Sequence, residues 1–309
     1  MKQAGAPPQG KWTGNPSGGV KAPDPLMLPD PARRFTDTAA RLEALAAGHP
    51  MQDWLRFMSK LAYAQREALS ELKPLAGLEA AVVAQAVDAR MPPLAADGHR
   101  RDPAWRVGLA RLLDGFDDRA MPPQVRTVTA RLHGRDGAAV ESLADAFLHG
   151  EVEPADAGPV LYVAAALQLY FTAMAATLPA PELRLLPQRG LCPCCGSTPI
   201  GGLVTATGPN PGARYLYCSL CSTAWNHVRA VCITCGDSRS IKLEAIEGDA
   251  GIVKAETCGH CHTYAKMIYQ AQDTQADPFA DDLASLGLDI LVAEAGWSRH
   301  APNPLLLVS

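Results

Sequence analysis

Apolar residues recur with helical spacing through the first part of the chain. In the first such segment Phe35, Ala39, Leu42 and Ala46 are three or four residues apart, so they fall on one face of a helix. Asp30 stands just before a proline at the start of this segment, and this pair is typical of a helix N-terminus. The pattern therefore predicts an amphipathic helix that begins just after Asp30.

Further helices are predicted at short intervals as far as about residue 180, and prolines or glycines separate them. Their approximate ranges are 52–72, 78–89, 103–115, 123–132, 138–149 and 159–178. No stretch of alternating apolar and polar residues, which would indicate a strand, interrupts them. Residues 30–187 are therefore expected to form an all-helical domain. A flexible lead-in rich in proline and glycine is expected at 1–29, ordered only where it lies against the body.

The last of these helices lies in a stretch without charged residues, from Ala157 to Pro181. This length is sufficient to cross a bilayer. However, the stretch is rich in alanine, contains Gln168 and Thr172, and has prolines near both ends. We therefore expect a buried helix at the centre of the helical domain and no membrane span. Gln65, on the apolar face of the 52–72 helix, is expected to be a hydrogen-bonded core amide.

The pattern changes after residue 190, where short strands become the best interpretation. Two hairpins are predicted, the first from strands at 203–207 and 214–217 and the second from strands at 240–247 and 252–257. After them the chain is expected to become helical again at 264–270. A final helix is predicted to begin at Asp277, and its predicted buried face consists of Leu283, Leu286, Ile290 and Ala293.

The strand-forming region contains all nine cysteines of the chain. Eight of them form Cys-x-x-Cys pairs, which are Cys192/Cys195, Cys218/Cys221, Cys232/Cys235 and Cys258/Cys261. The spacing between the first and second pairs is the same as that between the third and fourth, so Cys192 corresponds to Cys232 and Cys221 to Cys261. This internal repeat predicts two small tandem modules, at 188–227 and 228–270, followed by a C-terminal helix and tail at 271–309. The expected fold class is α+β.

The spacing of the cysteines indicates metal binding. Two cysteines separated by two residues can turn both sulfurs toward one point, and Gly196 and Gly236 permit the tight turn that follows. Two such pairs joined by a hairpin place four thiolates around one ion, which suits zinc or iron. The eight paired cysteines are therefore the expected ligands, although Cys194 leaves open which two of three bind at the first pair. Candidates for hydrogen bonds to the sulfurs are Cys194, His227, His260 and His262.

Composition and charge limit the range of possible functions. With 309 residues, 48% hydrophobic and 19% charged, the chain is long and apolar enough for about two ordered domains. Residues 189–270 contain seven basic and five acidic residues, and eight metal-bound thiolates make this region net negative. This argues against a nucleic-acid-binding zinc ribbon, which needs a positive surface. Many cysteines without an export signal favour the cytoplasm.

Two other motifs are weak. Residues 5–11 (GAPPQGK) match the start of a phosphate-binding loop, but Trp12 stands where a Ser or Thr is needed, so no nucleotide site is expected. The segment Cys258-Gly-His-Cys261 has the sequence of a disulfide isomerase active site, but the expected hairpin is not the strand–helix context that activates such a thiol. No catalytic constellation is recognised, and we expect a non-enzymatic protein.

Several segments resemble the formate dehydrogenase accessory protein family, FdhE. They are CPCCGSTP at 192–199, YLYCSLCSTAWNHVRAVCITCG at 215–236, CGHCHTYAK at 258–266, the tail at 278–304 and RLEALAAGHP at 41–50. The resemblance covers most of the chain. It implies a cytoplasmic assembly factor that is needed to produce active formate dehydrogenase and binds the catalytic subunit of that enzyme. It also implies two rubredoxin-like modules, each with one iron ion held by four of the eight paired cysteines.

Two alternatives stay open at the level of sequence. Four thiolates accommodate both zinc and iron, so the preference for iron depends on the resemblance alone. If iron is bound, the protein is alternatively a rubredoxin-like electron carrier or a redox enzyme that acts on its partner.

Overall fold

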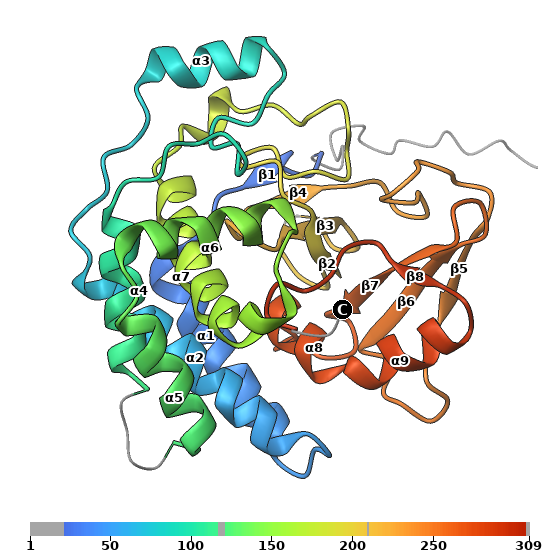
Figure 1. Ribbon diagram of the computed structural model, residues 1–309. Coiled ribbons are helices and arrows are strands. Elements are labelled where there is room, and N and C mark those ends of the chain that lie inside the picture. Colours follow the sequence, from blue (N-terminus) through green and yellow to red (C-terminus); the bar gives the residue numbers. More distant parts are fainter. Residues whose placement is uncertain (1–21, 117–120, 209, 307–309) are drawn as a thin grey trace, which may run out of the picture.

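The computed structural model describes residues 22–116, 121–208 and 210–306. Within these residues seven helices form the N-terminal part, and an eight-stranded sheet with two further helices forms the C-terminal part (Figure 1). The expected α+β fold class is confirmed.

The helical domain follows the apolar pattern closely. Its helices are α1 (Pro31–Ala46), α2 (Gln52–Glu71), α3 (Ala80–Asp88), α4 (Ala104–Asp114), α5 (Pro123–His133), α6 (Gly137–His149) and α7 (Ala157–Ala176). Asp30 caps α1 by accepting a hydrogen bond from the Ala32 backbone N–H at 3.0 Å. The predicted stripe of α1 is buried from Phe35 to Ala46. Capping and periodicity were sufficient to predict these elements.

Helix α7 is the centre of this domain, as predicted. Every residue from Val160 to Thr172 is buried, and α1, α2, α4, α5 and α6 pack around it. Its length and composition would suit a membrane span, but 83% of the candidate window is buried inside the protein. Gln65 is the expected core amide, because its Nε2 donates to the Ala165 carbonyl oxygen at 2.9 Å.

The sheet has the strand order β1-β4-β3-β2-β7-β6-β5, with β8 also paired to β7. Its strands are β1 (Leu26–Met27), β2 (Pro199–Val204), β3 (Arg214–Cys218), β4 (Ala224–Asn226), β5 (Ile241–Glu244), β6 (Val253–Cys258), β7 (Thr263–Tyr269) and β8 (Ser298–Arg299). The two predicted hairpins are β2–β3 and β5–β6. Each gains a third antiparallel strand, and parallel pairing of β2 with β7 joins both halves into one sheet.

The helix predicted at 264–270 is wrong, because this segment is strand β7. It pairs with β6 on one side and with β2 on the other, and its residues from Tyr264 to Ile268 are all buried. A strand covered on both faces lacks the alternation that marks a half-exposed strand, and the buried run from Tyr264 to Ile268, which includes Lys266, shows no period of two. Such a run cannot be told from a helix by its periodicity.

The C-terminal helix is interrupted, which makes half of its predicted buried face wrong: Leu286 is half-buried, and Ile290 and Ala293 are exposed. Asp277 caps the first part, α8 (Pro278–Ala284), by accepting from the Ala280 N–H at 2.7 Å. Ser285 then leaves helical geometry, and α9 (Leu286–Glu294) follows. This break shifts the phase of the second part. Leu283 is buried as predicted, but α9 buries Leu288, Asp289 and Val292.

The described end of the N-terminal lead-in lies against the sheet. Leu26 pairs with Trp225 of β4, and the Tyr215 hydroxyl donates to the Asp24 carbonyl oxygen at 3.2 Å. Residues 5–11 and most of the lead-in predicted at 1–29 lie outside the described part of the chain.

Candidate metal centres

The first cysteine pair of each repeat half forms the same backbone turn. Gly196 N–H donates to the Cys192 carbonyl oxygen at 2.9 Å, and Gly236 N–H donates to that of Cys232 at 3.0 Å. The two glycines have φ values of +78° and +76°. Residues with a Cβ rarely adopt this left-handed region, so glycine is favoured after the first pair of each half.

The second pair of each half ends a strand, and there too the halves match. Cys218 is the last residue of β3 and Cys258 the last of β6. The residue after each fourth cysteine has a positive φ, +60° at Ser222 and +56° at His262. Local sequence and strand position thus bring the two pairs of each half together.

The eight paired cysteines form two clusters, each of which could hold a metal ion. Within each cluster the four Sγ atoms lie within 4.8 Å of one another. The distance is 3.5 Å from Cys192 Sγ to Cys221 Sγ in centre 1 (the first cluster), and 3.7 Å from Cys232 Sγ to Cys261 Sγ in centre 2 (the second). Metal–thiolate bonds of about 2.3 Å in a tetrahedron place the sulfurs about 3.8 Å apart. The donor set and its spacing therefore fit a zinc or iron ion.

Two side-chain hydrogen bonds to the sulfurs come from threonines that sequence reasoning missed. Thr223 Oγ1 lies 3.2 Å from Cys221 Sγ, and Thr263 Oγ1 lies 3.1 Å from Cys261 Sγ. The two threonines occupy equivalent positions of the repeat, each next but one after the fourth cysteine of its half. A hydroxyl that donates to a thiolate stabilises its charge. The recurrence of Cys-x-Thr in both halves was a signal that could have identified them.

The two centres differ in burial. In centre 1 Cys192, Cys218 and Cys221 are 0% exposed and Cys195 is 1% exposed. Burial and the neighbouring sulfurs raise the pKa of Cys192 well above its ordinary value. Without a cation such a thiol stays protonated, and a metal ion that binds there displaces the proton. In centre 2 Cys235 is exposed and Cys261 is half-buried.

The four other candidate residues make contacts of different kinds. Cys194 is buried outside the four-sulfur cluster. Its backbone N–H donates to Cys192 Sγ at 3.4 Å, and its carbonyl oxygen accepts from the Leu94 N–H at 2.8 Å. His260 and His262 are exposed, and the His262 ring stacks on Trp297 with 5.7 Å between ring centroids.

His227 faces an arginine that bridges the two halves of the repeat. Its Nδ1 lies 2.7 Å from Arg214 Nη2, and burial together with the Arg214 charge lowers the pKa of His227 to about 4. Arg214 is itself buried and donates from Nη1 to Glu256 Oε1 of β6 at 2.7 Å. This buried ion pair ties β3 to β6 across the sheet.

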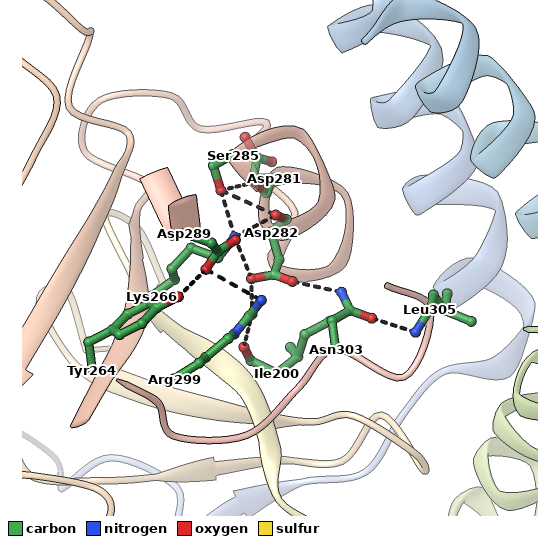
Figure 2. A network of polar contacts seen from close by, with 10 residues as sticks. All are labelled: Ile200, Tyr264, Lys266, Asp281, Asp282, Ser285, Asp289, Arg299, Asn303 and Leu305. Atoms are coloured by element: carbon green, nitrogen blue, oxygen red, sulfur yellow. Dashed lines mark hydrogen bonds and ion pairs between the residues drawn. The ribbon is translucent and has the colours of Figure 1, made fainter. Parts of the chain in front are cut away.

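A second polar cluster that the sequence did not reveal holds the C-terminal segment on the sheet (Figure 2). Lys266 of β7 is 0% exposed, and its Nζ donates to the Asp282 carbonyl oxygen and to Asp289 Oδ2, each at 2.6 Å. The same Nζ lies 3.0 Å from Asp282 Oδ1. Arg299 pairs with the Asp282 carboxylate as well, and Asn303 Nδ2 donates to its Oδ2 at 2.6 Å. Thus α8, α9, β8 and the tail meet around the buried pair of Lys266 and Asp282.

Helix α1 also contacts the C-terminal segment through an ion pair. Arg41 donates from Nε to Asp281 Oδ2 at 3.0 Å and from Nη2 to Asp281 Oδ1 at 2.7 Å. Its Nη1 also lies 2.7 Å from Asp273 Oδ2. Such two-point geometry fixes the relative orientation of the helical domain and α8.

A helical domain joined to one sheet that carries two symmetric four-cysteine clusters defines the class of this molecule. It is an α+β protein with two four-cysteine sites, each of which could hold a metal ion. Three family models match it in succession: FdhE N-terminal at residues 23–187, FdhE central domain at 191–229 and FdhE C-terminal domain at 230–306. The chain belongs to the FdhE family.

Relatives from several bacteria agree with this assignment over nearly the full length. The chain is 40% identical over 291 residues to an FdhE homolog from Edwardsiella ictaluri, covering 94% of each protein. It is 35% identical over 278 residues to an FdhE homolog from Stutzerimonas stutzeri, covering 89% of this chain and 90% of the relative. The crystal structure of the FdhE protein from Pseudomonas aeruginosa superposes with a TM-score of 0.83 at 34% identity, covering 91% of this chain and 98% of that one. The predicted resemblance is confirmed.

Proposed function

We propose that this protein is a cytoplasmic accessory factor for formate dehydrogenase, that it binds the catalytic subunit of that enzyme, and that it is not itself an enzyme. One observation carries the proposal: a chain of the FdhE family brings eight cysteines into two four-sulfur clusters. Family membership supports the general role, a formate dehydrogenase accessory protein with two four-cysteine sites. Its net charge of −4 also favours a protein partner over a nucleic acid.

In this proposal each cluster binds one metal ion through its four cysteines, and iron is favoured over zinc by the family resemblance. A bound ion supplies a cross-link between two loops that are distant in the sequence. The remaining chemistry belongs to the chain: Thr223 and Thr263 donate to thiolates, and Gly196 and Gly236 allow the turns. The sheet, ordered by both centres, is then a rigid platform for a partner.

Co-purification tests this role. We expect the tagged full chain to recover the catalytic subunit of formate dehydrogenase from cells that produce both proteins. Cys232→Ser and Cys258→Ser should reduce recovery at least about tenfold, because they remove ligands whose metal orders the second half of the repeat. Cys194→Ala is the matched control, since it changes a cysteine outside the clusters. Failure of the wild-type chain to recover the subunit would refute the proposal.

The exposure of Cys235 favours electron transfer as a second candidate function. A surface ligand places an iron ion close to a docked redox partner. Elemental analysis of anaerobically purified protein decides the matter: two iron ions per chain would keep this candidate, and zinc in both centres would eliminate it, because zinc has no redox chemistry.

A further inference from the structure

The two centres share spacing and turn geometry but differ in their surroundings. Centre 1 is attached to the helical domain on two sides. Beside its first cysteine pair, the Leu94 and Ala96 N–H groups donate to the carbonyl oxygens of Cys194 and Cys195 at 2.8 and 2.9 Å. Beside its second pair, Gln168 Nε2 of α7 donates to the Ser219 carbonyl oxygen at 2.8 Å.

The cysteines of centre 1 are part of the main hydrophobic core. They belong to the same buried cluster as α7 residues such as Leu169 and Phe171. Cys195 itself lines a cavity of about 520 Å³ together with Pro92 and Leu191, but it is only 1% exposed. An incoming ligand therefore approaches this centre through that cavity, and it reaches the metal only when the residues that cover Cys195 move aside.

Centre 2 lies on the opposite half of the sheet, next to the edge strand β5. Thr234, Cys235 and Gly236 of its first turn are all exposed, and so is His260 between its second pair of cysteines. Two of its four ligands, Cys232 and Cys258, are buried. The Cys235 side of the centre thus meets solvent without any change of the fold.

We propose that the two centres have different kinetic roles. Centre 1 is a permanent structural site. Centre 2 is an exchange site, where thiolate, imidazole or chelating groups from outside the protein reach the metal from the Cys235 side. The inference rests on the proposed function only in requiring that both centres hold metal. In the exchange step an outside donor binds the metal as the Cys235 thiolate leaves and takes a proton from solvent. No change of oxidation state is involved.

Metal release from the zinc-loaded full chain tests this assignment. With an excess of the colorimetric chelator 4-(2-pyridylazo)resorcinol, we expect two phases of one equivalent each. The rates should differ at least ~100-fold, since centre 2 exchanges from the native state and centre 1 only after the residues that cover Cys195 move aside. Release of both equivalents at one rate would overturn the inference.

A pair of variants at equivalent repeat positions separates the two roles. Cys235→Ser should abolish the fast phase, retain one slowly released equivalent and keep the native circular dichroism spectrum. Cys195→Ser, the matched variant at the equivalent position of the first half, should lose the native spectrum as well as metal. Loss of the slow equivalent from a folded Cys235→Ser protein would contradict the assignment.

Alkylation of the wild-type protein gives a readout that does not depend on variants. Neutral iodoacetamide followed by peptide mass mapping should modify Cys235 first in the zinc-loaded chain. Modification of Cys195 at the same rate as Cys235 would contradict the inference.

The outcomes for the two proposals are separable. Loading of fewer than two zinc equivalents would refute the metal part of the proposed function. Two equivalents that leave together would refute only the exchange site. Failure to co-purify with formate dehydrogenase would leave the release phases of the isolated chain unchanged.

Discussion

Lys266 is a fully buried cation in the middle of a strand, and its partners explain how the fold accommodates it. Its ammonium group lies among Asp282, Asp289 and Ser285, so its charge and its donors are satisfied (Figure 2). Arg299 adds a second cation to the two carboxylates. The cluster is therefore close to neutral as a whole, and removal of one member leaves a buried charge without a partner.

We predict that Lys266→Met destabilises the protein by about 3–5 kcal/mol, because Asp282 and Asp289 then share one cation in a buried site. Urea denaturation followed by circular dichroism measures the change in the free energy of unfolding. Arg239→Met is the control: Arg239 pairs with Asp237 at 3.4 Å, but its side chain is 87% exposed. That change should stay within about 0.5 kcal/mol. Equal effects of the two substitutions would contradict the structural role of Lys266.

Titration of the Asp282 carboxyl should make the stability of the folded protein depend on pH. Burial alone would raise its pKa, but Lys266 and Arg299 outweigh burial and hold the pKa of Asp282 below its ordinary value of 3.8. A lowered folded-state pKa adds stability that is fully present above the unfolded-state pKa and is lost as the pH falls through the folded-state pKa. The advantage of wild type over Asp282→Asn should therefore be largest above about pH 5 and shrink toward pH 3. Unfolding midpoints at several pH values measure it, and a constant difference would contradict it.

At the scale of elements, the pairing of β2 with β7 decides how the two repeat halves assemble. Gly201 and Gly202 of β2 lie against β7, and a Cβ at Gly201 would come within 2.7 Å of the Lys266 carbonyl oxygen. A Cβ at Gly202 would come within 2.6 Å of the Met267 sulfur. Two adjacent glycines allow the strands this close approach.

We predict that Gly201→Ala lowers the free energy of unfolding by about 1–3 kcal/mol, because the new methyl group meets backbone that cannot move without shifting β7. Gly287→Ala on α9 is the matched control, since a Cβ there has no heavy atom within 4 Å. It should be neutral or stabilising by up to about 1 kcal/mol. Thermal and urea unfolding measure both variants. An unchanged stability of Gly201→Ala would show that the strands are farther apart.

At the scale of the whole molecule, centre 1 connects the two parts of the fold. Its cysteines share one core with α7, and Arg41 joins α1 to α8 on another side. The helical domain and the sheet (Figure 1) are therefore expected to unfold together, even though the sequence divides them near residue 188.

We predict that complete metal removal lowers the melting temperature by more than about 10 °C, because a four-cysteine site contributes substantially to folding. The helical circular dichroism signal, measured during heating, should melt earlier along with the sheet. Zinc should restore the original transition, and magnesium should not, because thiolates bind it poorly. A helical domain that keeps its melting temperature without metal would show that the two parts are independent.

Several features were predictable because their causes are local. Asp30 and Asp277 cap helices through contacts within the next three residues, and Gly196 and Gly236 follow from the turn that each cysteine pair requires. The composition of α7 was enough to expect a buried helix.

The errors have a common cause, which is that remote contacts overrode local patterns. Segment 264–270 has no alternation of apolar and polar residues that would identify a strand, and only its pairing with β2 and β6 makes it β7. At Ser285, where the helix breaks, the side-chain Oγ accepts a hydrogen bond from Lys266 of strand β7 at 3.1 Å. No periodicity within the last helix contains that information.

By itself the sequence determined the helical domain, the α+β class and the two groups of four cysteines, because capping, periodicity and ligand spacing act over short stretches of chain. The tertiary structure alone decided that both repeat halves share one sheet, that Lys266 holds the C-terminal segment, and that one centre is fully buried while its repeat partner is exposed on the Cys235 side. Two nearly identical local motifs differ in burial because burial depends on what packs against them, and that is set by residues far away in the chain.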